Sequence, residues 1–258
     1  MHPTSVTSHK MMNTVVILSA LATTVLSKDL YFGSGKPRIS TDTAQDQFMD
    51  CYDYLNQGGD RLRVIDYIPA LALYNFDNRI SSCCLTGIWL FYADNDYNIA
   101  NPSAADWWVY GDNYCTNVPT KFDNAISSLR HTGAPDAWTA DTINFYFNEF
   151  FIGGEEYYYR DTAQLNYDNQ AKSIIVTGCS GWTLYSEKNY AGTCKCVWPS
   201  DVLKCYPGFY TTESSLGILS KTVSSAKKGC FCAASALPDN QGMKVENGGA
   251  SGFFTGKN

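Results

Sequence analysis

The chain has 258 residues, a formal net charge of −6 and an aromatic content of 14%, with 18 tyrosines. This charge argues against nucleic acid and anionic membranes as partners, because binding to phosphate groups needs clustered lysine and arginine side chains. The tyrosines, together with many turn-forming glycine, asparagine and aspartate residues, favour strands over helices. We therefore expect an all-β protein whose charge suits cations.

The N-terminal residues have the pattern of a secretory signal peptide. An apolar run over residues 15–26 follows a basic start, and Val25 and Ser27 are of the kind that a signal peptidase accepts before its cleavage site. The run is too short and too rich in serine and threonine to predict a transmembrane helix, so an uncleaved anchor is the weaker alternative. We predict a signal peptide over residues 1–27, an irregular N-terminal arm over residues 28–44 and a secreted, extracellular product without a transmembrane segment.

The cysteines divide into two even sets, which indicates disulfides closed within each half of the chain. The first half holds four and the second holds six: Cys51, Cys83, Cys84, Cys115, Cys179, Cys194, Cys196, Cys205, Cys230 and Cys232. The connectivity is not readable from spacing alone. A zinc site in the segments Cys194–Cys196 and Cys230–Cys232 is the alternative, but the CxC spacing differs from that of a zinc knuckle.

A short polar sequence occurs twice in the first half. The hexapeptide Asp77-Asn78-Arg79-Ile80-Ser81-Ser82 recurs as Asp123-Asn124-Ala125-Ile126-Ser127-Ser128. Each copy offers carboxylate, amide, hydroxyl and backbone oxygens in one corner, which is the ligand set that Ca²⁺ prefers. The recurrence also indicates repeated units of about 40–50 residues, the size of a four-stranded Greek key.

Four segments share a folded-hairpin pattern, in which an aromatic strand leads into a turn and a further strand. Tyr52, Tyr146 and Tyr185 each precede a glycine by seven residues. Glycine suits such a turn because it adopts backbone conformations that other residues resist. Ile99 stands where the second hairpin would have its glycine, so we expect that hairpin to be reshaped.

These hairpins and corners resemble the βγ-crystallin family over roughly residues 45–232, most specifically in the segment Gly181–Gly192. The resemblance implies an all-β fold of two βγ-crystallin-like Greek-key β-sandwich domains, each burying a core shared by two keys. The implied domains are residues 45–133 and 139–232, joined by a linker that contains Gly133 and Pro135. Residues 233–258 have little apolar content, and we expect a flexible C-terminal tail there.

The resemblance further implies up to two Ca²⁺ ions in domain 1. One site would use Asp77, Asn78, the carbonyl of Arg79 and the hydroxyl of Ser81, with Asp94 or Asp96 from the second hairpin. The other would use Asp123, Asn124, the carbonyl of Ala125 and the hydroxyl of Ser127, with Asp53 from the first hairpin. The alternative is that each corner is only a hydrogen-bonded turn.

Domain 2 departs from this pattern. The corner at residues 168–173 has Lys172 in place of the hydroxyl, and an ammonium group cannot ligate a cation. The corner at residues 220–225 lacks the acidic or amide pair. We predict one calcium-binding domain and one domain with degenerate sites.

The sequence predicts a protein that is not an enzyme. After the signal peptide His131 is the one histidine, and no nucleophile-elbow, zinc-protease or phosphate-binding motif occurs. The function expected is that of a secreted calcium-binding structural protein. The alternative is a defence or toxin-associated binding module that acts with a partner chain or on glycans, with residues 107–108 and 157–159 as aromatic platforms for sugars.

Overall fold

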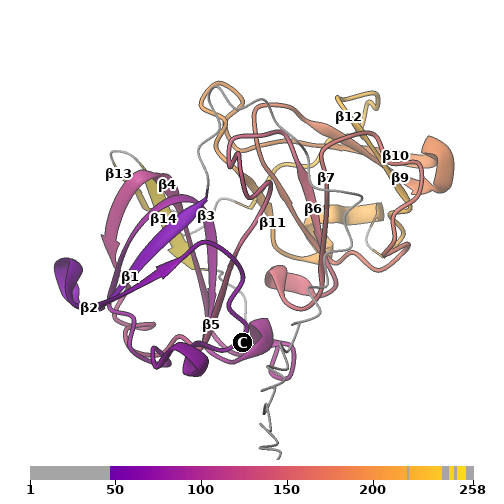
Figure 1. Cartoon of the computed structure of the whole chain (residues 1–258). Coiled ribbons are helices and arrows are strands. Elements are labelled where there is room, and N and C mark those ends of the chain that lie inside the picture. Colours follow the sequence, from indigo (N-terminus) through magenta and orange to yellow (C-terminus); the bar gives the residue numbers. More distant parts are fainter. Residues whose placement is uncertain (1–46, 220, 240–243, 247–248, 254–258) are drawn as a thin grey trace, which may run out of the picture.

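The computed structural model describes residues 47–219, 221–239, 244–246 and 249–253. The predicted signal peptide and N-terminal arm lie outside these residues. Figure 1 shows two lobes side by side, each built almost entirely of strands. We call the part around β1–β5 with β13 and β14 the first lobe, and the part around β6–β12 the second lobe.

The first lobe contains a seven-stranded antiparallel sheet in the order β13-β14-β4-β3-β1-β2, with β5 paired to β3. Its strands are β1 (Phe48–Tyr54), β2 (Gly58–Val64), β3 (Ser82–Tyr92), β4 (Asp106–Asn117), β5 (Ser128–His131), β13 (Lys244–Glu246) and β14 (Gly249–Phe253). Its short 3-10 turns are η1 (Leu55–Gln57), η2 (Leu71–Tyr74) and η3 (Asp96–Asn98).

The second lobe contains a four-stranded sheet, β11-β8-β6-β7, and a three-stranded sheet, β10-β9-β12. Its strands are β6 (Ile143–Tyr146), β7 (Glu155–Tyr158), β8 (Ser173–Val176), β9 (Trp182–Glu187), β10 (Ala191–Val197), β11 (Gly208–Tyr210) and β12 (Ser225–Lys228). Its helical turns are η4 (Glu149–Phe151), η5 (Lys188–Tyr190), α1 (Glu213–Leu216) and η6 (Gly217–Leu219). The all-β class predicted from the sequence is confirmed.

Strand β3 is buried on both faces, which explains its long apolar run. Successive side chains of a strand point to opposite faces of the sheet. Trp89 and Phe91 therefore enter the core of the first lobe, whereas Leu90 and Tyr92 enter a second cluster shared with the other lobe. This shared cluster includes Phe151 of η4, so the two lobes are joined by an apolar interface as well as by the chain.

The C-terminal residues differ from the flexible tail predicted over residues 233–258. Strand β14 pairs with β4 from Gly249 opposite Gly111 to Phe253 opposite Trp107, which extends the first sheet. A Cβ atom at Gly249 would lie 2.4 Å from the carbonyl oxygen of Tyr110, so only glycine allows this approach. The prediction was wrong for β14, because its mostly small side chains pair with the sheet without providing apolar bulk, and β13 pairs with β14 in turn.

Four disulfides close within the halves of the chain, as the sequence predicted. They join Cys84 to Cys115, Cys179 to Cys205, Cys194 to Cys232 and Cys196 to Cys230. The zinc alternative is wrong, because all four cysteines of the two CxC segments are oxidised. The predicted pairing does not extend to Cys51 and Cys83, which face each other across β1 and β3 as buried thiols. Burial raises the pKa of the Cys83 thiol.

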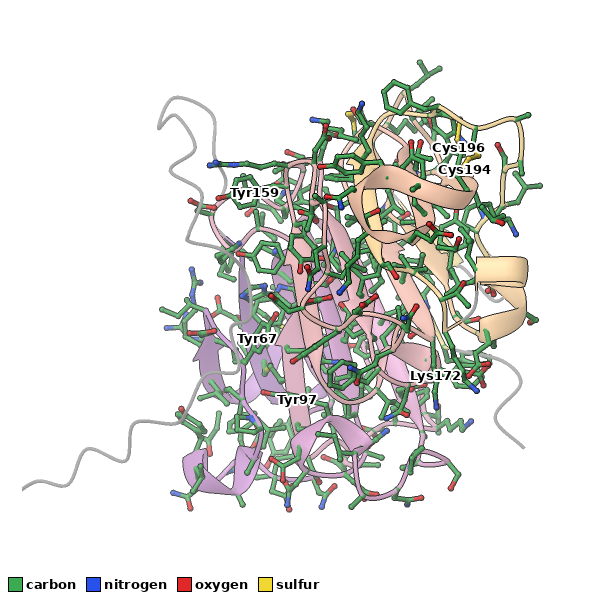
Figure 2. All side chains as sticks on the ribbon, turned by 90° about the vertical axis from the view of Figure 1, so that its right-hand side faces the viewer. Tyr67, Tyr97, Tyr159, Lys172, Cys194 and Cys196 are labelled. Carbon is green, nitrogen blue, oxygen red and sulfur yellow. A yellow bond between two sulfur atoms is a disulfide. The ribbon has the colours of Figure 1, made fainter. Side chains whose placement is uncertain are left out.

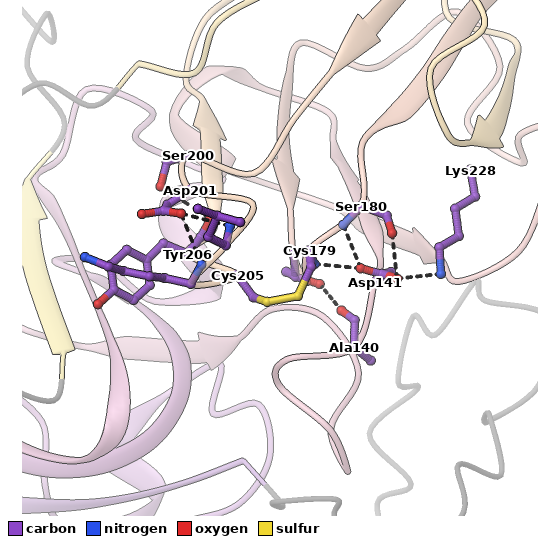
Figure 3. Close-up of a disulfide and its surroundings, with 12 residues drawn as sticks. Ala140, Asp141, Cys179, Ser180, Ser200, Asp201, Cys205, Tyr206 and Lys228 are labelled. Atoms are coloured by element: carbon purple, nitrogen blue, oxygen red, sulfur yellow. Dashed lines mark hydrogen bonds and ion pairs between the residues drawn. A yellow bond between two sulfur atoms is a disulfide. The ribbon is translucent and has the colours of Figure 1, made fainter.

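The Cys179–Cys205 disulfide is flanked by a carboxylate that orders the second lobe (Figure 3). Asp141 accepts hydrogen bonds from the backbone N–H groups of Cys179 and Ser180 at 2.7 and 2.9 Å. Its other oxygen lies 2.5 Å from the ammonium nitrogen of Lys228 on β12. Hydrogen bonds to the charged form lower the pKa of Asp141 against the opposing effect of burial.

The aromatic platforms suggested for sugar stacking are largely inside the protein. Trp107 and Trp108 are 0% and 2% exposed, and Tyr157 and Tyr158 are buried as well. These rings therefore pack the cores and are not presented to a ligand. In the part of the chain that the structure describes, no helix has the length and apolarity to cross a membrane.

Candidate functional site

The four polar corners adopt one backbone geometry, although their sequences differ. The second residue of each corner has a left-handed conformation, with φ of 53°, 54°, 60° and 53° at Asn78, Asn124, Asn169 and Lys221. Asparagine tolerates this conformation better than most residues, which explains its use in three of the four. The corner at Lys221 thus keeps this backbone conformation although it lacks the acidic or amide side chains of the other corners.

The corners meet in pairs within each lobe. The N–H of each left-handed residue donates to a carbonyl of the facing corner: Asn78 to Ile126 at 3.0 Å, Asn124 to Ile80 at 3.2 Å, Asn169 to Val223 at 3.0 Å and Lys221 to Ala171 at 3.3 Å. The two keys of a lobe are therefore strapped together at their corners by reciprocal backbone hydrogen bonds. Each candidate site is composed of residues from both keys.

The last serine of each corner holds the neighbouring hairpin. Ser82, Ser128, Ser173 and Ser225 each donate through Oγ, at 2.6 Å, to the carbonyls of Tyr54, Asp94, Asn148 and Glu187 respectively. Each Oγ also accepts a backbone N–H from the same hairpin, at 2.9 to 3.1 Å. The sequence contained these serines at equivalent positions, but their structural role was not predicted.

The structure moves Ser81 from one of the two sites predicted in the first lobe to the other. Ser81 was grouped with Asp77, yet its Oγ donates to Asp123 Oδ1 at 2.6 Å, and its N–H donates to the Tyr52 carbonyl at 2.8 Å. Ser127 donates its N–H to the Tyr92 carbonyl at 2.9 Å. The predicted grouping of Ser81 with Asp77 was wrong, because the side chain of Ser81 crosses to the facing corner.

The first composite site, which we call the Asp53 site, lines a cavity of about 550 Å³. Its lining residues are Asp53, Tyr54, Leu55, Arg79, Ser81 and Asn124. Asp53 Oδ1 accepts the N–H of Asp60 at 2.7 Å, and Asp53 Oδ2 lies 2.6 Å from a guanidinium nitrogen of Arg79. The hydrogen bond from Arg79 lowers the pKa of Asp53. Asp53, the hairpin carboxylate predicted for this site, is present and is already paired with the guanidinium of Arg79.

The second composite site, which we call the Asp77 site, has an oxygen that is not satisfied. Asp77 Oδ1 is buried and has no hydrogen-bond partner among the described residues. Its other oxygen accepts a hydrogen bond from the amide of Asn78 at 3.2 Å. The carboxylate of Asp94 accepts a hydrogen bond from Asn101 at 2.9 Å. A buried acceptor without a donor fits a hard cation, whose preferred ligands are carboxylate and carbonyl oxygens.

The two remaining predicted ligands, Arg79 and Ala125, were assigned through their backbone carbonyls. Both follow directly after the left-handed asparagine of their corner, so they lie on the corner backbone as expected. The side chain of Arg79 is directed to the Asp53 site, where it pairs with carboxylates of the first hairpin. Its role there was not predicted from the sequence.

Lysine side chains lie in or beside both corners of the second lobe. Lys172, labelled in Figure 2, lines a cavity of about 440 Å³ with Pro102, Asn148, Glu149, Phe150 and Glu213. The ammonium nitrogen of Lys221 lies 3.0 Å from Glu213 Oε1. At the other composite site of this lobe Ser224 Oγ donates to Asn169 Oδ1 at 3.3 Å, and Lys188 lies 3.3 Å from Asp168 Oδ2. Asn169 thus accepts the hydroxyl of a serine from the facing corner, and Asp168 pairs with a lysine of the fourth hairpin.

The candidate catalytic groups are engaged in packing. His131 is fully buried beside Tyr67 and Trp89, and burial lowers its pKa to about 3. Glu155 and Glu156 are consecutive on β7 and therefore point to opposite faces of the sheet. Within the described residues no group of three histidine, cysteine, aspartate or glutamate side chains is arranged around a common metal position.

Comparison with solved structures defines the fold class. Geodin, a βγ-crystallin from Geodia cydonium, aligns over 71% of this chain and 99% of its own, with a TM-score of 0.55 and 17% identity. A βγ-crystallin from an archaeon covers 34% of this chain and 98% of its own, with 24% identity and a TM-score of 0.30. One from Ciona intestinalis covers the same shares, with 20% identity and a TM-score of 0.29.

No protein-family model matches the chain, and no curated protein matches its sequence. The likeness to geodin extends over both lobes and gives the class: a protein of paired Greek-key sandwiches. The chain has the βγ-crystallin fold, as its hairpins and corners predicted.

Proposed function

We propose that this chain is a secreted calcium-binding protein with a structural role outside the cell, in which Ca²⁺ stabilises the first lobe. The observation that carries the proposal is the unpartnered Asp77 Oδ1, buried where two corners of different keys meet. An anionic oxygen that is removed from water without a donor destabilises the lobe, and a bound cation relieves this cost.

Several residues of this chain would hold the ion. Asp77 would supply a carboxylate, while the corner at Ser127 would supply a hydroxyl from the other key. Asp94, on the hairpin that Ser128 fixes, would provide a further oxygen through small changes of its side chain. The ion would link two keys that are otherwise joined there by backbone hydrogen bonds, so binding would oppose their separation.

The affinity is expected to lie between about 10⁻⁶ and 10⁻³ M, because the site has few formal charges. At a free concentration of about 100 times the dissociation constant, binding would add about 2.7 kcal/mol to the free energy of unfolding. Such a gain is a large part of the total stability of an ordinary domain, about 5–15 kcal/mol.

Isothermal titration calorimetry on the oxidised protein tests this proposal. We expect saturable binding of Ca²⁺ that disappears in Asp77→Asn, a variant that keeps the size and shape of the side chain. Asp66→Asn is the matched control, since Asp66 is an exposed aspartate of the same lobe. The proposal is wrong if wild-type protein shows no binding at about 10 mM Ca²⁺, above the weakest range expected for an extracellular site.

A further inference from the structure

Arg79 holds an unusual position for a residue of a cation-binding corner. One guanidinium nitrogen lies 2.6 Å from Asp53 Oδ2 and 2.7 Å from Asp60 Oδ2, so it joins both carboxylates of the first hairpin. The other terminal nitrogen donates to the carbonyl of Asn75 at 2.7 Å. The guanidinium carbon also lies 5.0 Å from the ring centre of Phe76. The cation is thus anchored by groups outside the Asp53 site as well as by its carboxylates.

The four composite sites differ in whether a basic side chain reaches them. Arg79 pairs with Asp53, Lys188 pairs with Asp168, and Lys221 pairs with Glu213 beside Lys172. In the described parts of the chain, no ion pair involves Asp77. The Asp77 site therefore differs from the other three in that, among the described residues, neither of its carboxylates, Asp77 and Asp94, is paired with a lysine or arginine.

We propose that Arg79 acts as a built-in cation in the place of a metal ion at the Asp53 site, so that the first lobe binds one Ca²⁺, at the Asp77 site. This inference rests on the proposed function and fixes its stoichiometry. It also changes the reading of the two similar corners, which by sequence alone would each bind an ion.

The physical reason is competition between a tethered cation and a free one. Arginine stays charged at any physiological pH, so its charge cannot be titrated away to admit a metal. For Ca²⁺ to use Asp53, the ion must either displace the guanidinium, which costs its bonds to the carboxylates, or remain beside it, where like charges repel. The ion pair itself is partly exposed and contributes little to stability. The ion pair matters for metal binding, because Arg79 occupies the Asp53 oxygen that a metal ion would need.

The test is the number of ions bound, measured by isothermal titration calorimetry with CaCl₂ and checked by equilibrium dialysis with ⁴⁵Ca. Wild-type protein is expected to bind one ion, and Arg79→Gln is expected to bind two. Asp77→Asn should bind none, whereas the double variant Arg79→Gln with Asp77→Asn should bind one, at the Asp53 site. Glutamine removes the charge and leaves a shorter, neutral polar side chain at this position.

Arg63→Gln is the matched control, because Arg63 pairs with Asp50 on the sheet at 2.8 Å, and its loss changes the net charge equally. It should leave the stoichiometry at one. Two ions bound by the wild type with affinities within tenfold of each other would overturn the inference, as would a single ion bound by Arg79→Gln. Absence of binding in all variants would instead overturn the proposed function, so the two failures are distinguishable.

Discussion

At the scale of single residues, one buried oxygen separates two corners that look alike in sequence. Asp77 Oδ1 has no partner, whereas Asp123 Oδ1 accepts a short hydrogen bond from Ser81. The recurrence of the hexapeptide predicted equal corners. The sites also differ at Arg79, whose side chain pairs with the carboxylates of the first hairpin, and no pattern of spacing shows where a long flexible side chain will go.

The Asp77→Asn variant should therefore have opposite effects with and without Ca²⁺. Without the ion we expect equal or greater stability, by up to about 1 kcal/mol, since the amide removes a buried unpaired charge. At saturating Ca²⁺ the wild type should gain about 2.7 kcal/mol that the variant lacks. Urea unfolding in each condition measures both. A variant that is destabilised without Ca²⁺ would show that Asp77 has a partner in solution.

His131 gives the protein a predictable sensitivity to acid. Its pKa is about 3 in the folded protein because of burial and the nearby Arg130, against about 6.5 in an unfolded chain. The unfolded state therefore binds more protons between pH 3 and 6.5, and stability falls as the pH is lowered through this range. The steepest contribution is about 1.4 kcal/mol per pH unit.

His131→Phe keeps an aromatic ring beside Tyr67 and Trp89 and should lose this dependence. Glu156 has the opposite effect on stability, because burial raises its pKa to about 7. The stability that comes from its neutral form is therefore lost as the pH rises from about 4.5. The comparison must therefore be the difference in stability between wild type and variant at each pH. Equal slopes in thermal unfolding from pH 4 to 7 would contradict the assignment.

At the scale of elements, the last serine of each corner sets the conformation of a folded hairpin. Ser173→Ala removes the Oγ that donates to Asn148 and accepts from Phe151, and it leaves a buried backbone N–H without a partner. We expect a loss of about 1–3 kcal/mol in the free energy of unfolding. Ser103→Ala is the control, because the Ser103 hydroxyl is exposed. Losses of similar size in both variants would argue against this role.

Elements that need a particular residue at a fixed spacing could be predicted from the sequence, and elements without such a pattern could not. The hairpins at Tyr146 and Tyr185 were recognisable because a turn that needs glycine leaves a fixed spacing. Ile99 was correctly expected to alter the second hairpin: there Asp96, Tyr97 and Asn98 are left-handed, and Ile99 itself is right-handed helical. Strand β14 was not predictable, because its small residues derive their stability from pairing with β4 and not from a periodic pattern.

At the scale of the whole molecule, a buried arginine joins the lobes. Arg130 on β5 donates to the carbonyls of Phe151 and Gly153 in the second lobe, at 2.6 and 2.9 Å. Nearby, Tyr67 donates to Glu155 at 2.7 Å, and Figure 2 shows Tyr67 close to Tyr97 where the lobes meet. The sequence predicted a linker after Thr132, yet Thr132 and Gly133 are buried, so the connection belongs to the interface.

Arg130→Met should uncouple the two lobes. Methionine fills similar space but donates no hydrogen bond, so the carbonyls of Phe151 and Gly153 lose the bonds from Arg130. The buried carboxylate of Glu155, 3.9 Å from Arg130, keeps its hydroxyl donors but loses its counter-charge. Removing one member of a buried charged pair costs about 3–5 kcal/mol. Because this cost falls on the interface, we expect calorimetry to show two unfolding transitions where the wild type shows one. Adding Glu155→Gln should recover part of the loss, since no buried charge then stays unpaired. A single transition with a loss below about 1 kcal/mol would mean that the apolar cluster around Tyr92 and Phe151 suffices to hold the lobes together.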